Sequence, residues 1–234
     1  MLKIQCFHSS SNGNLYGISD GNTTIMLECG VDFKTIQTSF EFKLSEVAAC
    51  IITHEHKDHS KSWEKIAKYM PVYMLKETAE ALEAKGYNIK HYTPREAFNL
   101  GDFSITPLTA NHDAPCCSFS IYNTNTRERV LFATDTALLE EYPFNVSYAL
   151  IECNYQLDII NEEVDRGRLN NVGRNRIIRS HMGLDTTVKI LKSLNPATLK
   201  EIYIIHLSAR HIDKAHAKKV IEEAVGKPVV IAKK

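Results

Sequence analysis

The segment IITHEHKDHS at residues 51–60 most constrains what this chain can become. It holds four candidate metal ligands: His54, His56, Asp58 and His59. They follow the apolar run VAACIIT, which is typical of a strand covered on both faces, and a loop at the end of such a strand can aim several side chains in one direction. Neutral imidazole nitrogens and carboxylate oxygens bind divalent metal ions. The segment therefore predicts a metal site at the end of a buried strand.

The size and charge of the chain limit the other possibilities. Its 234 residues are enough for one large domain with a substantial core, and we expect a single domain over residues 1–234. The 28 basic residues balance the 28 acidic ones, so any binding site for a polyanion must be local. No apolar stretch is long enough for a signal peptide or a membrane span, and the six cysteines form no C-x-x-C pair. We expect a cytoplasmic protein with reduced thiols and no membrane partner.

Strand and helix patterns alternate along the chain. Strands are predicted at LKIQCFH, NLYGISD, TTIMLEC and VAACIIT, and again at FNLGDFSITPLTA, CCSFSIYNT, RVLFATD and YALIEC. Helices are predicted at SWEKIAKYM, ETAEALEAKG, TTVKILKSL and KAHAKKVIEEAVG. This order of strands, helices, strands and helices suggests an α/β chain built from two layered halves.

The H-x-H-x-D-H segment resembles the signature of the metallo-β-lactamase fold superfamily, whose members bind two metal ions at the edge of a four-layer αββα sandwich. That resemblance implies further ligands after later strands, and the chain offers His112 in TANHDA, Asp135 in FATDT and His206 in YIIHLS. By this likeness, one ion would be held by His54, His56 and His112. The other would be held by Asp58, His59 and His206, and Asp135 would bridge the two ions.

The implied chemistry is hydrolysis. A pair of divalent ions, zinc or manganese, lowers the pKa of a water held between them, and the resulting bridging hydroxide is the nucleophile. Asp58 is the catalytic carboxylate that the resemblance implies. Redox members of the superfamily carry a glutamate in place of His56, which argues against an oxygen-reducing di-iron centre.

Further segments resemble the YycJ/WalJ-like branch of the superfamily, which is linked with DNA exonuclease activity. They are FHSSSNGNLY, LECGV, NHDA and IECNYQLDII, so the likeness spans almost the whole chain. The chain departs from the branch pattern at SHMGLDTT and HLSARHID, which fall on expected substrate contacts.

Each residue expected to contact the substrate has two interpretations. His181 is the candidate proton donor to the leaving oxygen, or a structural histidine at a helix start. Arg174, Arg176 and Arg179 form either a phosphate-binding cluster or an ordinary solvated helix face. Ser11 and Asn14 stand in a polar loop that either approaches a phosphate or makes a simple turn.

Three functions remain open from the sequence. The favoured one is a two-metal phosphodiesterase that acts on nucleic acid as a DNA exonuclease does, with DNA favoured over RNA. The alternative is a hydrolase of small esters, thioesters or lactones with the same fold. The third is a binding module that keeps metal for structure alone.

Overall fold

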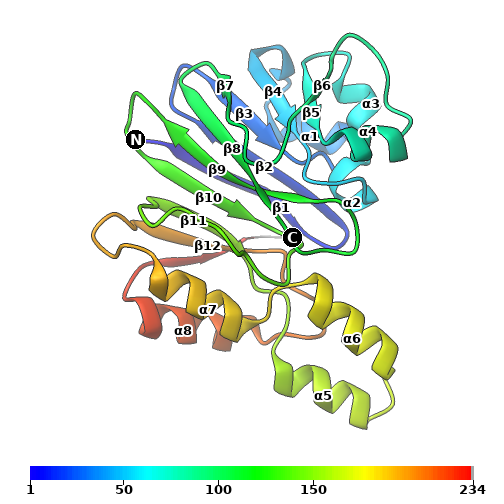
Figure 1. Ribbon diagram of the computed structural model, residues 1–234, viewed down its shortest axis with the longest axis vertical. Helices are drawn as coiled ribbons and strands as arrows, with labels where there is room; N and C mark the ends of the chain where they lie inside the picture. Colours follow the sequence, from blue (N-terminus) through cyan, green and yellow to red (C-terminus); the bar gives the residue numbers. More distant parts are fainter. Residues whose placement is uncertain (233–234) are drawn as a thin grey trace. The chain divides into compact units, whose positions relative to one another are not determined.

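The computed structural model describes residues 1–232 and shows two β-sheets flanked by helices (Figure 1). One sheet has six strands in the order β1-β2-β3-β4-β5-β6, and the other has seven in the order β13-β12-β11-β10-β9-β8-β7. The predicted α/β class with two halves is confirmed.

The six-stranded sheet opens with an antiparallel meander of three predicted strands and continues with parallel strands. Its strands are β1 (Lys3–Ser10), β2 (Gly13–Ser19), β3 (Thr24–Leu27), β4 (Val47–Ile51), β5 (Val72–Met74) and β6 (Ile89–His91). Because β3, β4, β5 and β6 are parallel, the loops that follow them leave from one edge of the sheet. The loop after β4 carries the histidine cluster.

Short helices accompany this sheet. They are α1 (Phe33–Ser39), the 3₁₀ helix η1 (Leu44–Glu46), α2 (Lys57–Ser60), α3 (Trp63–Ile66) and α4 (Lys76–Ala81). Apolar side chains of β2 to β5 form one core with Ile36 of α1, Ile66 of α3 and Ala79 of α4. Helix α2 was not predicted, because the four polar residues KDHS carry no helical periodicity of their own.

The seven-stranded sheet contains β7 (Phe98–Leu100), β8 (Phe103–Thr109), β9 (Cys117–Asn123), β10 (Arg129–Ala133), β11 (Tyr148–Glu152), β12 (Glu201–Ile205) and β13 (Val229–Ile231). Strands β10 to β13 are parallel. Strand β11 is buried at every position, as its continuous apolar sequence leads one to expect.

Four helices belong to the second half of the chain: α5 (Leu157–Asp165), α6 (Asn171–Ser180), α7 (Leu184–Ser193) and α8 (Lys214–Val225). Helices α7 and α8 lie beside strands β11 to β13, and their apolar residues share one core with those strands (Figure 1). Helices α5 and α6 contact each other as a pair. The arginine-rich α6 was read from sequence as either a helix face or a phosphate site, and it is a helix with Asn170 as its N-cap.

Two compact units make up the described chain. The first contains residues 1–107 and 121–128, and the second contains residues 108–120 and 129–232. Among residues 1–232, no helix has the length and apolarity needed to cross a membrane.

Candidate metal centre

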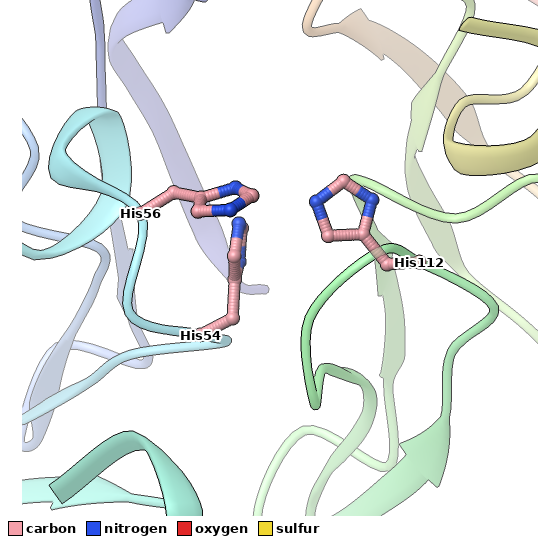
Figure 2. Close-up of side chains that lie close together, drawn as sticks. All are labelled: His54, His56 and His112. Atoms are coloured by element: carbon pink, nitrogen blue, oxygen red, sulfur yellow. The ribbon is translucent and has the colours of Figure 1, made fainter. Parts of the chain in front are cut away.

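The first unit gathers three histidines just after β4. His54 and His59 are buried, whereas His56 is partly exposed. The ring centroids of His54 and His56 lie 4.5 Å apart, with the ring planes at 74° to each other (Figure 2). The ring centroids of His54 and His59 lie 4.3 Å apart. The sequence cluster is therefore also a cluster in space, because the loop turns directly into α2 and brings His59 back beside His54.

Neighbouring oxygens orient two of these rings. Nδ1 of His54 lies 2.9 Å from Oγ1 of Thr53, and Nδ1 of His59 lies 3.3 Å from Oε1 of Glu28. With the proton on Nδ1, each ring carries its lone pair on Nε2, the form that binds a metal ion. Glu28 is fully buried and sits just after β3 with a left-handed φ of 62°. Glu28 was not among the predicted site residues, although an acidic residue directly after an apolar strand is a visible signal.

Asn14, in strand β2 of the first hairpin, contacts the segment of residues 52–60, which we call the metal loop. Its side chain is fully buried, and Nδ2 lies 3.1 Å from the carbonyl oxygen of Asp58 and 3.2 Å from Nε2 of His59. Nδ2 also donates to Ser10, while Oδ1 accepts a hydrogen bond from Tyr16. The amide is thus engaged inside the unit. Ser11, the other substrate contact predicted in this hairpin, is exposed.

The second unit brings four side chains together after its parallel strands. Asp135 follows β10, Glu152 ends β11, His206 follows β12, and His181 follows α6 as its C-cap residue. One ligand atom from each of the four lies within 4.8 Å of the others. They converge because the carboxyl ends of parallel strands meet at the same edge of a sheet. The left-handed φ values of 49° at Asp135 and 51° at His206 turn the chain sharply at this edge, a backbone strain that is common at functional sites.

Glu152 organises this second cluster. Its Oε1 lies 2.8 Å from Nδ1 of His181 and 2.8 Å from Nδ1 of His206. Its Oε2 accepts hydrogen bonds from the backbone of Thr136 and Met182, both at 3.2 Å. The glutamate is fully buried. It was not among the candidate site residues, although the IECNY segment that contains it resembled the family.

Burial and neighbouring charges shift the pKa values of His181 and Glu152 in opposite directions. Burial opposes the charged form of His181, but the carboxylates of Glu152 and Asp135 outweigh it and raise the pKa of His181 to about 10. Burial also opposes the charge of Glu152, yet the charge of His181 and the hydrogen bonds from the two histidines lower the pKa of Glu152. Without metal, His181 and Glu152 therefore form an ion pair at neutral pH.

His112 lies in the loop after β8 (Figure 2). Nδ1 of His112 lies 2.8 Å from the carbonyl oxygen of Ser180, and Nε2 lies 3.1 Å from Oδ1 of Asp113. Burial lowers the pKa of His112, which favours the neutral imidazole. A proton on Nδ1 then makes Nε2 the nitrogen suited to a metal ion.

Helix α6 presents its arginines on different faces. Arg176 binds Oδ2 of Asp113, with Nη2 at 2.7 Å and Nε at 2.9 Å. Arg174 instead donates from Nε to Oδ1 of Asn161 on α5, at 2.7 Å. The structure therefore does not bring Arg174 together with Arg176, although the sequence placed them in one cluster.

A groove of about 510 Å³ runs along α6, and we call it the α6 groove. Its lining residues are Asn111, His112, Asp113, Val172, Asn175, Arg176, Arg179 and Ser180. It joins two of the predicted substrate contacts, Arg176 and Arg179, to the predicted ligand His112.

The predicted ligands suit a divalent metal ion. All seven lie in segments that directly follow β4, β8, β10 or β12. Their donor atoms are imidazole nitrogens and carboxylate oxygens, the ligand types that zinc and manganese accept. Oε1 of Glu152 lies 2.8 Å from Nδ1 of His206 and Oε1 of Glu28 lies 3.3 Å from Nδ1 of His59, and carboxylates near Nδ1 are usual for histidines that bind metal through Nε2. The residues present fit a metal centre.

Comparisons with known proteins agree with this chemistry. A family model described as "Beta-lactamase superfamily domain" matches residues 23–207. The chain is 24% identical to "Exodeoxyribonuclease YycJ" of Bacillus anthracis over 245 residues, which cover 95% of this chain and 90% of that protein. It is 27% identical to "Exodeoxyribonuclease WalJ" of Streptococcus pneumoniae over 226 residues, which cover 88% of this chain and 82% of that protein.

A solved structure shows the same fold. The metallo-β-lactamase fold protein YhfI from Bacillus subtilis superposes with a TM-score of 0.77 at 19% identity, covering 99% of this chain and 96% of that one. At this identity the likeness establishes the fold alone.

Proposed function

Because the chain belongs to the metallo-β-lactamase superfamily, we propose that this hydrolase has a dinuclear metal site and cleaves phosphodiester bonds of nucleic acid, DNA in preference to RNA. The predicted membership of this superfamily and the predicted fold are confirmed by the family model and by the structural likeness. The observation that carries the proposal is the cluster of Asp135, Glu152, His181 and His206 after the parallel strands. The exodeoxyribonuclease names of the relatives support the choice of substrate.

We assign the metal ligands as the family likeness implies. One ion would be held by His54, His56 and His112, and the other by Asp58, His59 and His206, with Asp135 shared. Two divalent ions, zinc or manganese, would supply the nucleophilic water and offset the charge of the phosphate. Glu28 and Glu152 would hold the histidines in the tautomer that binds metal. Asp58, with a side chain 24% exposed beside His59, would orient the attacking water.

His181 is the proposed proton donor. The oxygen that leaves in phosphodiester cleavage is a poor leaving group unless it is protonated, and an imidazole suits that task. Nδ1 of His181 is held by Glu152, so Nε2 would donate. The side chain keeps 21% of its surface exposed, which leaves it accessible to a substrate.

The five predicted substrate contacts differ in their surroundings: some are accessible to a substrate, and others are engaged within the protein. Ser11 is exposed, and Arg176 and Arg179 line the α6 groove, so these three keep the role expected from the sequence. Arg174 points toward α5, and Asn14 is engaged inside the first unit. For Asn14 we therefore propose that it holds the metal loop in place.

We further propose that residues 1–234 act as one domain in the cytoplasm. The family model spans residues from both compact units, which supports a single functional domain. All six cysteines are thiols, as expected in a reducing compartment.

A cleavage assay tests the nuclease proposal. End-labelled DNA and RNA of the same sequence, single- and double-stranded, are incubated with the protein and Mn²⁺ or Zn²⁺. We expect DNA to be shortened by the wild type and not by Asp135→Ala. Equal products from the two proteins would contradict the proposal. If nucleic acid stays intact while a chromogenic ester is turned over, and Arg176→Gln leaves that turnover unchanged, the enzyme is instead a small-ester hydrolase.

A second assay separates the proton-donor role of His181 from a structural one. His181→Ala should slow DNA cleavage about 10²- to 10⁴-fold. The same variant should still cleave thymidine 5′-p-nitrophenyl phosphate at a rate close to that of the wild type, because p-nitrophenolate leaves without a proton. Equal loss on both substrates would show that His181 supports the site and donates no proton.

A further inference from the structure

The carboxylate of Asp113 joins an arginine to a predicted metal ligand. Its Oδ2 lies 2.7 Å from Nη2 and 2.9 Å from Nε of Arg176, and its Oδ1 lies 3.1 Å from Nε2 of His112. All three groups lie within the second unit and line the α6 groove. The side chain of Asp113 is 33% exposed, so this bridge stands at the surface of the groove.

These contacts are the ones that a substrate phosphate needs. A guanidinium fork binds a carboxylate and a phosphate in the same two-point geometry. Nε2 of His112 is the nitrogen proposed to hold a metal ion, and the scissile phosphate must approach such an ion. An anion that contacts Arg176 on one side and approaches Nε2 of His112 on the other therefore occupies the position expected for a phosphate.

The rest of the groove suits a nucleic-acid backbone. Arg179 lies three residues after Arg176 on the same helix face and brings a second positive charge. Asn175 is exposed and can donate hydrogen bonds, and Val172, 79% exposed, gives an apolar surface beside them. The volume of about 510 Å³ is in the range of small-molecule sites.

We propose that Asp113 is an internal anion that occupies a phosphate subsite in the α6 groove, and that a backbone phosphate of the substrate strand displaces it from Arg176. This inference rests on the proposed function, because it takes the phosphate to be that of the substrate. A neutral ester cannot compete with the Asp113 carboxylate for the guanidinium. Asp113 thus makes the site selective for phosphorylated substrates over neutral ones.

A binding assay with the full-length, metal-loaded protein tests the inference. The probe is a fluorescein-labelled DNA strand with phosphorothioate linkages, which keep their charge and resist cleavage, and the Kd is read from anisotropy. Asp113→Asn should tighten binding about three- to tenfold, because Arg176 is released. Arg176→Gln should weaken it about tenfold. In the double variant, the effect of Asp113→Asn should disappear, because no guanidinium remains to be released.

Charge-matched controls lie on α8. Glu223→Gln and Lys218→Gln remove one charge each from exposed ion pairs far along the chain from the groove. We expect both to bind the probe as the wild type does. If Glu223→Gln tightens binding as much as Asp113→Asn does, the effect is one of net charge and the inference is wrong. A strand with neutral methylphosphonate linkages should bind Asp113→Asn no better than the wild type.

Other outcomes separate this inference from the nuclease proposal. Weaker binding by Asp113→Asn, together with less bound metal by elemental analysis, would show that Asp113 positions His112 and would overturn the subsite. Normal DNA cleavage with no effect of Asp113→Asn on binding would also overturn it, and the nuclease proposal would stand. Tighter binding by Asp113→Asn without cleavage of any nucleic acid would support the phosphate subsite and contradict the nuclease proposal.

Discussion

Nδ1 of His206 lies 2.8 Å from Oε1 of Glu152, and both side chains are buried. The same carboxylate oxygen lies 2.8 Å from Nδ1 of His181. One glutamate at the end of β11 therefore orients two rings that follow different elements. Replacing such a carboxylate typically lowers metal affinity, because the histidine rings lose their orientation.

Glu152→Ala should lower both stability and metal affinity. The substitution leaves the partly buried His181 with Asp135 as its remaining carboxylate partner, and it leaves two backbone amides without their acceptor. The loss should be about 3–5 kcal/mol in the free energy of unfolding. Metal affinity should fall about 10- to 100-fold, because the histidine rings are no longer oriented. Urea denaturation and calorimetric metal titration measure the two effects. Glu140→Ala, at an exposed position, is the control, and a Glu152→Ala protein indistinguishable from it would refute the assigned role.

Gly30→Ala should displace the metal loop. A Cβ atom at Gly30 would lie 1.7 Å from the carbonyl oxygen of Asp58, a backbone atom that cannot move without shifting α2. We expect a loss of about 1–3 kcal/mol in stability and fewer bound metal ions per chain, measured by elemental analysis. Gly173→Ala is the matched control, because its Cβ would meet side-chain atoms and no backbone: Cδ1 of Leu169 at 3.0 Å and Oδ1 of Asn170 at 3.3 Å. Full metal content in Gly30→Ala would show that α2 does not depend on this close approach.

Asn14→Ala and Ser11→Ala should separate a structural role from a substrate contact. Removal of the buried Asn14 amide takes one hydrogen bond from the hydroxyl of Tyr16 and one from the carbonyl of Asp58. The free energy of unfolding should fall by about 1–3 kcal/mol. Ser11→Ala, at an exposed position, should change stability by less than about 0.5 kcal/mol. Thermal unfolding and the KM for DNA measure both. A raised KM with unchanged stability in Asn14→Ala would restore the substrate role predicted from its sequence.

The ionisation of His181 gives a pH prediction for the metal-free protein. Its pKa is raised to about 10 in the folded state, against about 6.5 in the unfolded chain. A raised pKa adds stability that is fully present below pH about 6.5 and is lost as the pH rises toward about 10. Urea denaturation of the chelated protein should therefore show stability falling across this window, and less so in His181→Gln.

Nuclear magnetic resonance of the His181 ring gives the direct measurement. The imidazole of the chelated wild type should remain protonated at pH 8. Titration of this ring near pH 6.5 would contradict the influence assigned to Glu152 and Asp135.

Much of the candidate site could be predicted because its predicted ligands stand where local sequence patterns end. An apolar strand pattern precedes each of His54, His112, Asp135 and His206. Such a pattern can be recognised from the sequence because its periodicity and composition depend only on neighbouring residues. The short strands β5, β6 and β13 and the helices α1 and α5 were not predicted. Each of the missed strands has only three residues, too few to show a periodicity.

The sequence by itself determined the types of the predicted ligands, their order, and most of the strands that they follow. Only the tertiary structure decided how those groups are held. Glu28 and Glu152 are acidic residues at strand ends, and their role follows from contacts with His59, 31 positions away, and His206, 54 positions away. Arg174 and Arg176, two positions apart, face different neighbours because a helix turns by about 200° over two residues. Contacts between distant segments arise from packing, and no local pattern of residues records them.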